Sequence, residues 1–338
     1  MDSAYTPSQV AEYLSYIGLP PSFHPSSSPT LNLAYLTALF THHITAIPYD
    51  NLSIHYSPAH AIALDPPSLF AKMVSSRRGR GGYCMETSIL FNHMLRALGF
   101  ADAYLTGVRI RPRGVDDGVP QGESYSGWVH LVNIVTVPDP DSDSEDEAKV
   151  KTKYAVDVGF GGDGMTAPMP LVDGLVHHNS LGTQEVRLVR DFIPNQRFRG
   201  GGGEGAHDTK MWVYQVRNGQ DEKWVSFFAF HDGFEFTEDD FGIVNWYTSQ
   251  SPECHQTWTP LVIWFLRGVG EEDGGARVVG KVMMVKGVIK RNLTGKTELV
   301  KVCATEEERV EALRELFGIH LTDEEVVSIR GRQAELVG

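Results

Sequence analysis

The chain has 338 residues and a mass of 37.5 kDa, a length that allows two or three domains. Hydrophobic residues make up 41% and charged residues 22% of it, as in ordinary globular proteins. The formal net charge of −13 argues against electrostatic binding of nucleic acid or of an anionic membrane as the main role. That charge does not exclude a small basic pocket for a phosphorylated cofactor.

The sequence shows no sign of membrane insertion or secretion. Its longest clean apolar run, 261–266, is far shorter than a membrane-spanning helix. The N-terminus has neither the basic nor the apolar region of a secretory signal. Three cysteines, Cys84, Cys254 and Cys303, are an odd and low number, which fits free thiols in a reducing compartment. We therefore expect a cytoplasmic protein.

Helices are predicted for much of the first hundred residues. Apolar residues recur at a helical spacing over 10–17 and 31–47, and the proline after the second run ends it. The clearest helix begins at Cys84 and carries one apolar stripe as far as Leu98. Gly99 then supplies a C-terminal stop.

The middle of the chain is rich in β-branched and aromatic residues separated by turn residues, which favours a barrel or a strongly bent sheet. The predicted strands are 104–110, 128–137, 154–160, 185–192, 211–217 and 224–230. Two inserts interrupt them, a polar one at 111–124 and one at 139–147 that has six acids in nine residues. We expect the acidic insert, and a glycine tract at 200–205, to be surface loops.

The last third mixes helix and strand. A Thr-Glu-Asp-Asp cap predicts a helical segment over 237–249. Strands are predicted at 261–266 and 278–289. Two helices with acidic first turns are predicted to close the chain, over 305–317 and 322–336.

Cys84 is the first candidate for chemistry. Gly81 and Gly82 precede it and allow a tight backbone approach and a positive φ. The cysteine then starts a predicted helix, where the partial positive charge favours thiolate over thiol. The alternative is that Cys84 is a small buried hydrophobe. Cys254 and Cys303 have no comparable glycine-rich approach, so they are better explained as core or surface thiols.

A thiol nucleophile needs a base, and the base needs an acceptor that orients it. His130 lies inside the predicted strand 128–137, among aliphatic residues. Asp157 lies in an apolar stretch where an unpaired carboxylate would be costly, and a histidine partner would account for it. The alternatives are a satisfied core histidine and an aspartate that caps the turn before Gly159.

Several segments resemble motifs of the arylamine N-acetyltransferases. Residues 80–86, followed by the apolar helix, resemble the family's signature. The other matching segments are 47–52 (its N-terminal motif), 128–132 and 154–161 (its His and Asp strands) and 241–252 (the start of its third domain). They occur in the family's order and extend from about residue 10 to residue 290.

The resemblance implies an α+β multidomain fold with a Cys84–His130–Asp157 triad, arranged as in cysteine proteases and transglutaminases. An N-terminal helical bundle, residues 1–100, would carry the nucleophile. A central β-barrel, 101–232, would carry the histidine and the aspartate. An inter-domain segment and an α/β lid domain would occupy 233–338.

The resemblance also implies a ping-pong reaction of xenobiotic metabolism. Cys84 would take the acetyl group of acetyl-CoA and pass it to an arylamine, arylhydroxylamine or hydrazine. His130 would act as general base, Asp157 would hold its tautomer, and backbone N–H groups near Cys84 would stabilise the oxyanion. The partners are an acyl-CoA and a small aromatic amine, with no metal, nucleic acid or membrane expected.

Smaller matches follow from the same resemblance. Ser126 and Gly127 match a pair that touches CoA in the family, although an ordinary turn before a strand is the alternative. Val129 and Phe160 are expected beside the acceptor, and Phe160 is also explained as a core aromatic. Arg80 is expected to contact the acid of the N-terminal motif and hold the nucleophile loop. That acid is Asp50 here, where the family usually has glutamate.

Other functions stay open at this point. A thiol hydrolase uses a similar triad, a degenerate member would only bind amines or CoA, and some relatives prefer propionyl or malonyl donors. A G-x-G-x-x-G pattern at 159–164 is followed by prolines instead of the helix that a dinucleotide site needs, so we expect none there. The adjacent histidine pairs lack the geometry of a metal chelate.

Overall fold

The computed structural model describes residues 3–111, 124–138, 151–179, 182–200, 208–269 and 275–338. The acidic insert predicted at 139–147 lies outside these ranges, as do most of the 111–124 insert and of the glycine tract. Within the ranges, no helix has both the length and the apolar character needed to cross a membrane.

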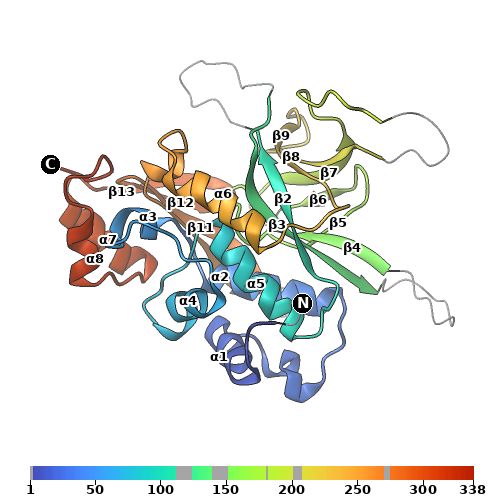
Figure 1. The fold of residues 1–338 in the computed structure, drawn as a ribbon, viewed down its shortest axis with the longest axis horizontal. Coiled ribbons are helices and arrows are strands. Elements are labelled where there is room, and N and C mark those ends of the chain that lie inside the picture. The colour runs from blue at the N-terminus through green and yellow to red at the C-terminus, as the bar shows by residue number, and fades with distance from the viewer. Residues whose placement is uncertain (1–2, 112–123, 139–150, 180–181, 201–207, 270–274) are drawn as a thin grey trace.

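The N-terminal helices occur where the sequence predicts them (Figure 1). They are α1 (Pro7–Ile17), α2 (Leu33–Ala46) and α5 (Cys84–Ala97). A capping box between Thr6 and Gln9 starts α1, and Gly18 ends it with a φ of 68°. Shorter elements that the sequence does not signal lie between them: the helices α3 (Leu52–Tyr56) and α4 (Pro66–Phe70), a π-helical turn (Ala71–Ser75) and the two 3-10 turns Pro21–Phe23 and Pro25–Ser27.

The middle of the chain forms one antiparallel sheet of eight strands in the order β5-β4-β3-β2-β9-β8-β7-β6. The strands are β2 (Tyr104–Ile110), β3 (Trp128–Pro138), β4 (Lys151–Val156), β5 (Met169–Pro170), β6 (Val176–His178), β7 (Glu185–Asp191), β8 (Met211–Arg217) and β9 (Val225–Phe230). The sheet curls like part of a barrel (Figure 1), with β5 and β6 at its edges. Pro170 in β5 has no N–H to donate to a further strand.

The strand predicted over 154–160 is misplaced. β4 begins earlier and ends at Val156, so Asp157 follows the strand instead of lying inside it. The reason is local, because Asp157 Oδ1 accepts the N–H of Gly159 at 2.9 Å and this contact turns the chain.

A second sheet has five strands in the order β1-β10-β11-β12-β13. They are β1 (Tyr49–Asp50), β10 (Leu261–Val269), β11 (Ala276–Val285), β12 (Val288–Leu293) and β13 (Lys296–Val302). The single strand predicted over 278–289 is wrong, because the chain makes a hairpin at Lys286, whose φ is 56°. β1 comes from the N-terminal region and pairs with β10, so distant parts of the chain share this sheet.

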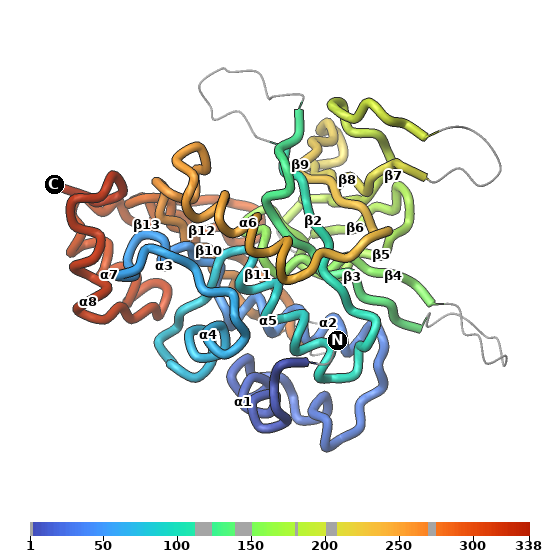
Figure 2. Tube along the Cα trace, viewed as in Figure 1, coloured from blue at the N-terminus to red at the C-terminus, as the bar shows by residue number. Residues whose placement is uncertain are grey.

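The described residues of the second half of the chain also form helices. They are α6 (Glu238–Gln250), α7 (Glu306–Phe317) and α8 (Asp323–Ser328), with 3-10 turn His255–Thr257 after α6. The helix predicted over 322–336 is wrong in length, since the chain turns after α8 and passes through Gly331 at a φ of 75°. Figure 2 shows α7 and α8, in red, beside the blue segment of α3, far away in the sequence.

The largest hydrophobic cluster joins the N-terminal helices to the inner face of the eight-stranded sheet, so α5 and β3 belong to one core. Polar contacts fix their relative position. Asn92 Nδ2 donates to Asn133 Oδ1 at 3.0 Å, and Ser88 Oγ donates to the carbonyl of Leu131 at 3.4 Å. The α+β class predicted from the resemblance is confirmed, while the division into domains at residues 100 and 232 stays a prediction.

Candidate active site

The loop before Cys84 depends on two glycines. A Cβ atom on Gly81 would lie 1.6 Å from the carbonyl oxygen of Pro48, and one on Gly82 would lie 2.6 Å from Cβ of Glu86. Gly82 also forms a parallel β-bridge with Tyr49. Neither residue has a positive φ, so the glycines serve close backbone approach only.

Cys84 is the first residue of α5 and is 5% exposed. The first helical hydrogen bond runs from the N–H of Thr87 to the carbonyl of Tyr83 at 3.1 Å, so the N–H groups of Cys84 and Met85 precede the helical ladder. Glu86 Oε2 accepts the N–H of Tyr83 at 3.1 Å and closes the helix start. The predicted placement of this cysteine at a helix N-terminus is confirmed.

Buried side chains hold this helix start on two sides. Lys72 Nζ lies 2.7 Å from Glu86 Oε1, and burial raises the pKa of Glu86 despite that cation. On the other side, the Tyr83 hydroxyl contacts Asn245 Oδ1 and lies 3.0 Å from Thr248 Oγ1, both on α6. The helix start is therefore anchored to segments from both halves of the chain.

His130 and Asp157 form a buried pair. His130 Nε2 lies 2.7 Å from Asp157 Oδ2, and the two residues are 1% and 3% exposed. Burial alone would lower the pKa of His130, but the Asp157 carboxylate and the contact with Cys84 outweigh it and raise the pKa to about 10. Asp157 therefore binds the histidine with one oxygen and caps its own turn with the other, so both sequence-based explanations of this residue hold.

A β-bulge brings the histidine strand to the cysteine. Val108 pairs with His130 and Arg109 pairs with Trp128, which leaves Val129 as the extra residue on β3. The carbonyl oxygen of Val129 is 4.0 Å from Cys84 Sγ. The bulge thus places the backbone of the histidine strand directly beside the sulfur.

Gly159 allows the turn that contains Asp157 to lie close to Cys84. A Cβ atom there would lie 2.8 Å from Cα of Cys84 and 2.8 Å from Oγ1 of Thr87. Phe160 follows it and meets the His130 ring edge-on, with the ring centroids 5.6 Å apart. The structure therefore brings together Cys84, Val129, His130, Asp157 and Phe160, from three separate segments.

The predicted CoA pair lies at the start of β3. Ser126 Oγ accepts the N–H of Ile110 at 2.9 Å and donates to the carbonyl of Gly127 at 2.8 Å, so this hydroxyl serves the local turn. Gly127 is exposed, and a Cβ atom there would have nothing within 4 Å among the described residues. Among the described residues, the Cβ side of Gly127 is therefore open to a ligand.

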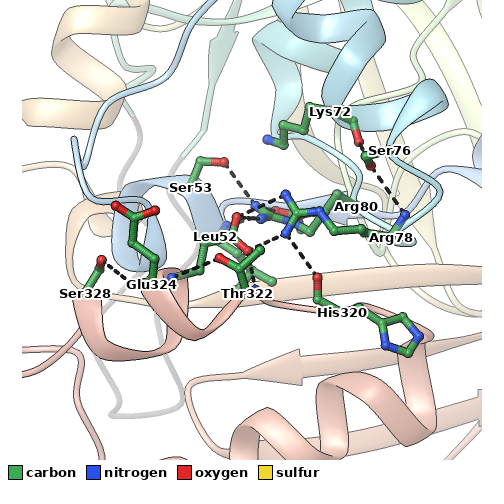
Figure 3. Close-up of polar contacts among 12 residues, drawn as sticks. Leu52, Ser53, Lys72, Ser76, Arg78, Arg80, His320, Thr322, Glu324 and Ser328 are labelled. Carbon is green, nitrogen blue, oxygen red and sulfur yellow. Dashed lines mark hydrogen bonds and ion pairs between the residues drawn. The ribbon is translucent and has the colours of Figure 1, made fainter.

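The predicted contact between Arg80 and Asp50 is confirmed. Arg80 Nη2 lies 3.3 Å from Asp50 Oδ1, and both side chains are almost completely buried. Asp50 also accepts the N–H of Gly81 at 2.7 Å and that of Leu52 at 3.0 Å. Burial alone would raise the pKa of Asp50, but Arg80 and Lys72 outweigh it and lower the pKa. Figure 3 shows Arg80 and Arg78 side by side in this network.

Sequence reasoning missed several residues of this region. Phe228 packs on Phe160 with the ring centroids 4.8 Å apart. Lys281, on β11, is 5% exposed and donates to the carbonyl of Gly162, with Asp163 Oδ1 at 3.5 Å. Glu325, on α8, reaches Arg80. No local pattern signals these contacts, because each joins segments far apart in the sequence.

In the described ranges, no group of three or more His, Cys, Asp or Glu side chains could hold a metal ion.

Comparison with known proteins is consistent with this geometry. A family model described as N-acetyltransferase matches residues 32–326. The N-malonyltransferase FDB2 of Fusarium pseudograminearum is 30% identical over 95% of this chain and 91% of that protein. The arylamine N-acetyltransferase of Escherichia coli K12 is 30% identical over 68% of this chain and 66% of that protein.

Solved structures agree on the fold. The arylamine N-acetyltransferase from Mycobacterium abscessus has a TM-score of 0.71 and 22% identity, with 99% of each chain covered. That of Mycobacterium marinum in complex with CoA has a TM-score of 0.65 and 22% identity, with 96% of this chain and 97% of that chain covered. With the family model spanning most of the sequence, the chain belongs to the arylamine N-acetyltransferase family of acyltransferases.

Proposed function

We propose that this protein moves an acyl group from an acyl-CoA to an arylamine, arylhydroxylamine or hydrazine through an acyl-Cys84 intermediate. The observation that carries the proposal is the buried His130–Asp157 pair, 2.7 Å apart, on a strand whose Val129 carbonyl lies 4.0 Å from Cys84 Sγ at the start of α5. A thiol, an imidazole and a carboxylate in this order form a nucleophilic triad.

The hydrogen bond to Asp157 decides which nitrogen of His130 does the chemistry. With Nε2–H donating to the carboxylate, Nδ1 is the nitrogen available to the Cys84 thiol. Proton transfer to Nδ1 yields a thiolate beside an imidazolium, a state that the raised pKa of His130 favours. Asp157 acts by orienting the ring and stabilising its charge.

The reaction then has two halves. The Cys84 thiolate attacks the thioester carbonyl, the bond to the CoA sulfur breaks, and His130 gives its proton to the departing thiolate. In the second half an amine attacks the acyl-Cys84 carbonyl, His130 takes the amine proton, and the Cys84 thiolate leaves. The N–H groups of Cys84 and Met85, ahead of the helical ladder, suit the developing oxyanion.

The remaining contacts of the proposal concern the substrates. The open backbone of Gly127 and its neighbour Ser126 suit CoA, a ligand that the Mycobacterium marinum relative binds. Phe160, with Phe228 behind it, offers an aromatic face to the acceptor, and Val129 borders the sulfur.

A second candidate donor is malonyl-CoA, because the relatives include N-malonyltransferase FDB2 proteins at 30% identity over nearly the whole chain. A malonyl group carries a carboxylate, which a cation would stabilise. Lys281 is a buried cation against Gly162 and Asp163 in the loop that follows Asp157. We propose it as the residue that would favour a carboxylated acyl group.

Intact-protein mass measurement tests the proposal. Incubation with acetyl-CoA or malonyl-CoA, without amine, should add one acyl group that Cys84→Ala abolishes and that aniline or a hydrazine then removes. Cys303→Ala is the matched control, because Cys303 is also buried and lies in the C-terminal part of the chain. Release of free acid without amine would indicate a thiol hydrolase instead, and acylation that survives Cys84→Ala would exclude this mechanism.

A further inference from the structure

A second carboxylate joins the Arg80–Asp50 pair from the opposite end of the chain. Glu325 Oε1 lies 2.8 Å from Arg80 Nη1, and Glu325 Oε2 lies 2.5 Å from Arg78 Nη1. One acid on the last helix therefore binds two arginines of the segment that leads to Cys84. Figure 3 shows these arginine side chains above His320 and Thr322 of the C-terminal segment.

The position of the Glu325 carboxylate is fixed by its own helix. Thr322 is the N-cap of α8, and its N–H donates to Glu325 Oε2 at 2.8 Å. In return, Thr322 Oγ1 accepts the N–H of Glu325 at 3.2 Å. This capping box removes much of the freedom of the glutamate side chain, so the acid is presented to the arginines in one geometry.

Because most of these charged side chains are buried, the loss of one charge is costly to the stability of the protein. The side chains of Arg80, Asp50 and Glu325 are 2%, 0% and 12% exposed. Two guanidinium groups thus face two carboxylates, and of the four only Arg78, whose side chain is 32% exposed, has substantial contact with solvent. Removing the Glu325 charge leaves the buried Arg80 with Asp50 as its one carboxylate partner in this cluster, a larger loss than that of a surface ion pair.

Backbone contacts dock the same two segments. The carbonyl of Arg78 accepts the N–H of His320 at 2.9 Å, and Arg78 Nη1 donates to the carbonyl of His320 at 3.2 Å. A Cβ atom on Gly79, whose φ is 69°, would lie 2.0 Å from the carbonyl oxygen of Gly318. The fit between the C-terminal segment and the arginine segment is therefore close at backbone level as well.

The arginine segment leads directly to the nucleophile. Arg80 and the N–H of Gly81 share the Asp50 carboxylate. Gly81 packs on the Pro48 backbone and Gly82 packs on the Glu86 side chain, and neither position has room for a Cβ atom. Because this loop is so tightly packed, a shift at Arg80 passes to the start of α5. That start holds Cys84 against the Val129 carbonyl.

We propose that Glu325 is a positioning residue for the nucleophile, acting through Arg80 and Arg78 to hold the loop that presents Cys84. The C-terminal helix α8 thereby sets the reactivity of a thiol that it does not touch. The inference rests on the proposed role of Cys84, and it goes beyond that role by giving the last helix a part in acyl transfer.

The test compares Glu325→Gln with Glu324→Gln in the full chain. Both variants lose one negative charge from adjacent positions of α8, but Glu324 is exposed and Figure 3 shows it pointing away from the arginines. Each is measured well below its unfolding transition, by the rate of Cys84 alkylation with iodoacetamide and by the rate of acyl loading from acetyl-CoA. We expect both rates to fall roughly three- to tenfold in Glu325→Gln and to stay unchanged in Glu324→Gln.

Glu325→Asp provides the second measurement. It keeps the charge with a side chain one methylene shorter, so it should recover part of both rates, while the KM for acetyl-CoA stays near that of the unaltered protein. Unaltered alkylation and loading rates in a Glu325→Gln protein that merely unfolds at a lower temperature would overturn the proposal and leave Glu325 a purely structural role. Failure of the Cys84 mechanism itself would instead show as missing acylation in the unaltered protein.

Discussion

His130 and Asp157 share a short hydrogen bond of 2.7 Å in a site from which solvent is almost fully excluded. The pair joins a strand interior to a turn, since His130 lies within β3 and Asp157 follows β4. The start of α5 with Cys84 lies close to both segments, since the Val129 carbonyl is 4.0 Å from Cys84 Sγ and a Cβ atom on Gly159 would lie 2.8 Å from Cα of Cys84. The chemistry proposed for the protein depends on this one junction.

Asp157→Asn should lower acyl transfer by about 10³- to 10⁴-fold with little change in overall fold. The asparagine can still cap the turn to Gly159, but its amide would face His130 Nε2 and force the proton onto Nδ1. The ring then cannot accept the proton of Cys84. Steady-state kinetics with acetyl-CoA and aniline measure the loss, and Asp173→Asn, an exposed aspartate that accepts the Arg190 N–H, is the control. Near-full activity in Asp157→Asn would contradict the assigned tautomer.

The His130–Asp157 pair should also make the stability of the protein depend on pH in the alkaline range. The pKa of His130 is raised from 6.5 to about 10, so the folded state favours the charged ring. Its contribution to the free energy of unfolding is then fully present below about pH 6.5 and is lost as the pH rises through about 10. As the pH rises across this range, urea unfolding should show the free energy of unfolding of the unaltered protein falling toward that of His130→Gln. A stability difference that grows with pH would be the opposite of the expected result.

Gly159→Ala should destabilise the protein and abolish acyl loading together. The added methyl group would lie 2.8 Å from Cα of Cys84, where backbone must move to admit it. Gly242→Ala is the matched control, because Gly242 lies in α6 with no heavy atom within 4 Å of its Cβ position among the described residues. Alanine there should raise the free energy of unfolding by about 0.5–1 kcal/mol. Equal behaviour of the two variants in thermal unfolding would refute the packing argument.

Arg80→Ala should lower the yield of folded protein before it changes the chemistry. It would leave Asp50 buried without its main cation, and breaking a buried pair of this kind costs about 3–5 kcal/mol. Arg77→Ala removes an exposed arginine whose contact to Glu12 is 3.4 Å long, so it should have little effect. The two variants are compared by their yield of soluble protein and by the midpoint of urea unfolding. A midpoint for Arg80→Ala equal to that of the unaltered protein would rule out the role of Arg80 in holding the loop.

Lys281→Met should discriminate between acyl donors. Methionine keeps the apolar stem and removes the charge, so transfer from malonyl-CoA should fall by about tenfold or more relative to transfer from acetyl-CoA. Lys290→Met, an exposed lysine of β12, is the control. The ratio of kcat/KM for the two donors is the measurement. An equal loss with both donors would show that Lys281 only supports the loop at Gly162.

Some of the helices and strands can be predicted from the local sequence. The apolar stripe after Cys84 predicts α5, and the strands β2 and β8 have the predicted bounds, because helix and strand periodicities are properties of neighbouring residues. The hairpin at Lys286 is not predicted, because only the pair Lys286-Gly287 separates the apolar residues of β11 from those of β12.

The sequence by itself determined which residues could do the chemistry: a cysteine at a helix start, a histidine in an apolar strand, an aspartate that needs a partner, and motifs that resemble one family. Tertiary structure alone decided how they meet. The extra residue at Val129, the close approach at Gly159 and the reach of Glu325 to Arg80 all join segments distant in sequence. Such contacts arise from packing of whole elements against one another, and no pattern of neighbouring residues encodes them.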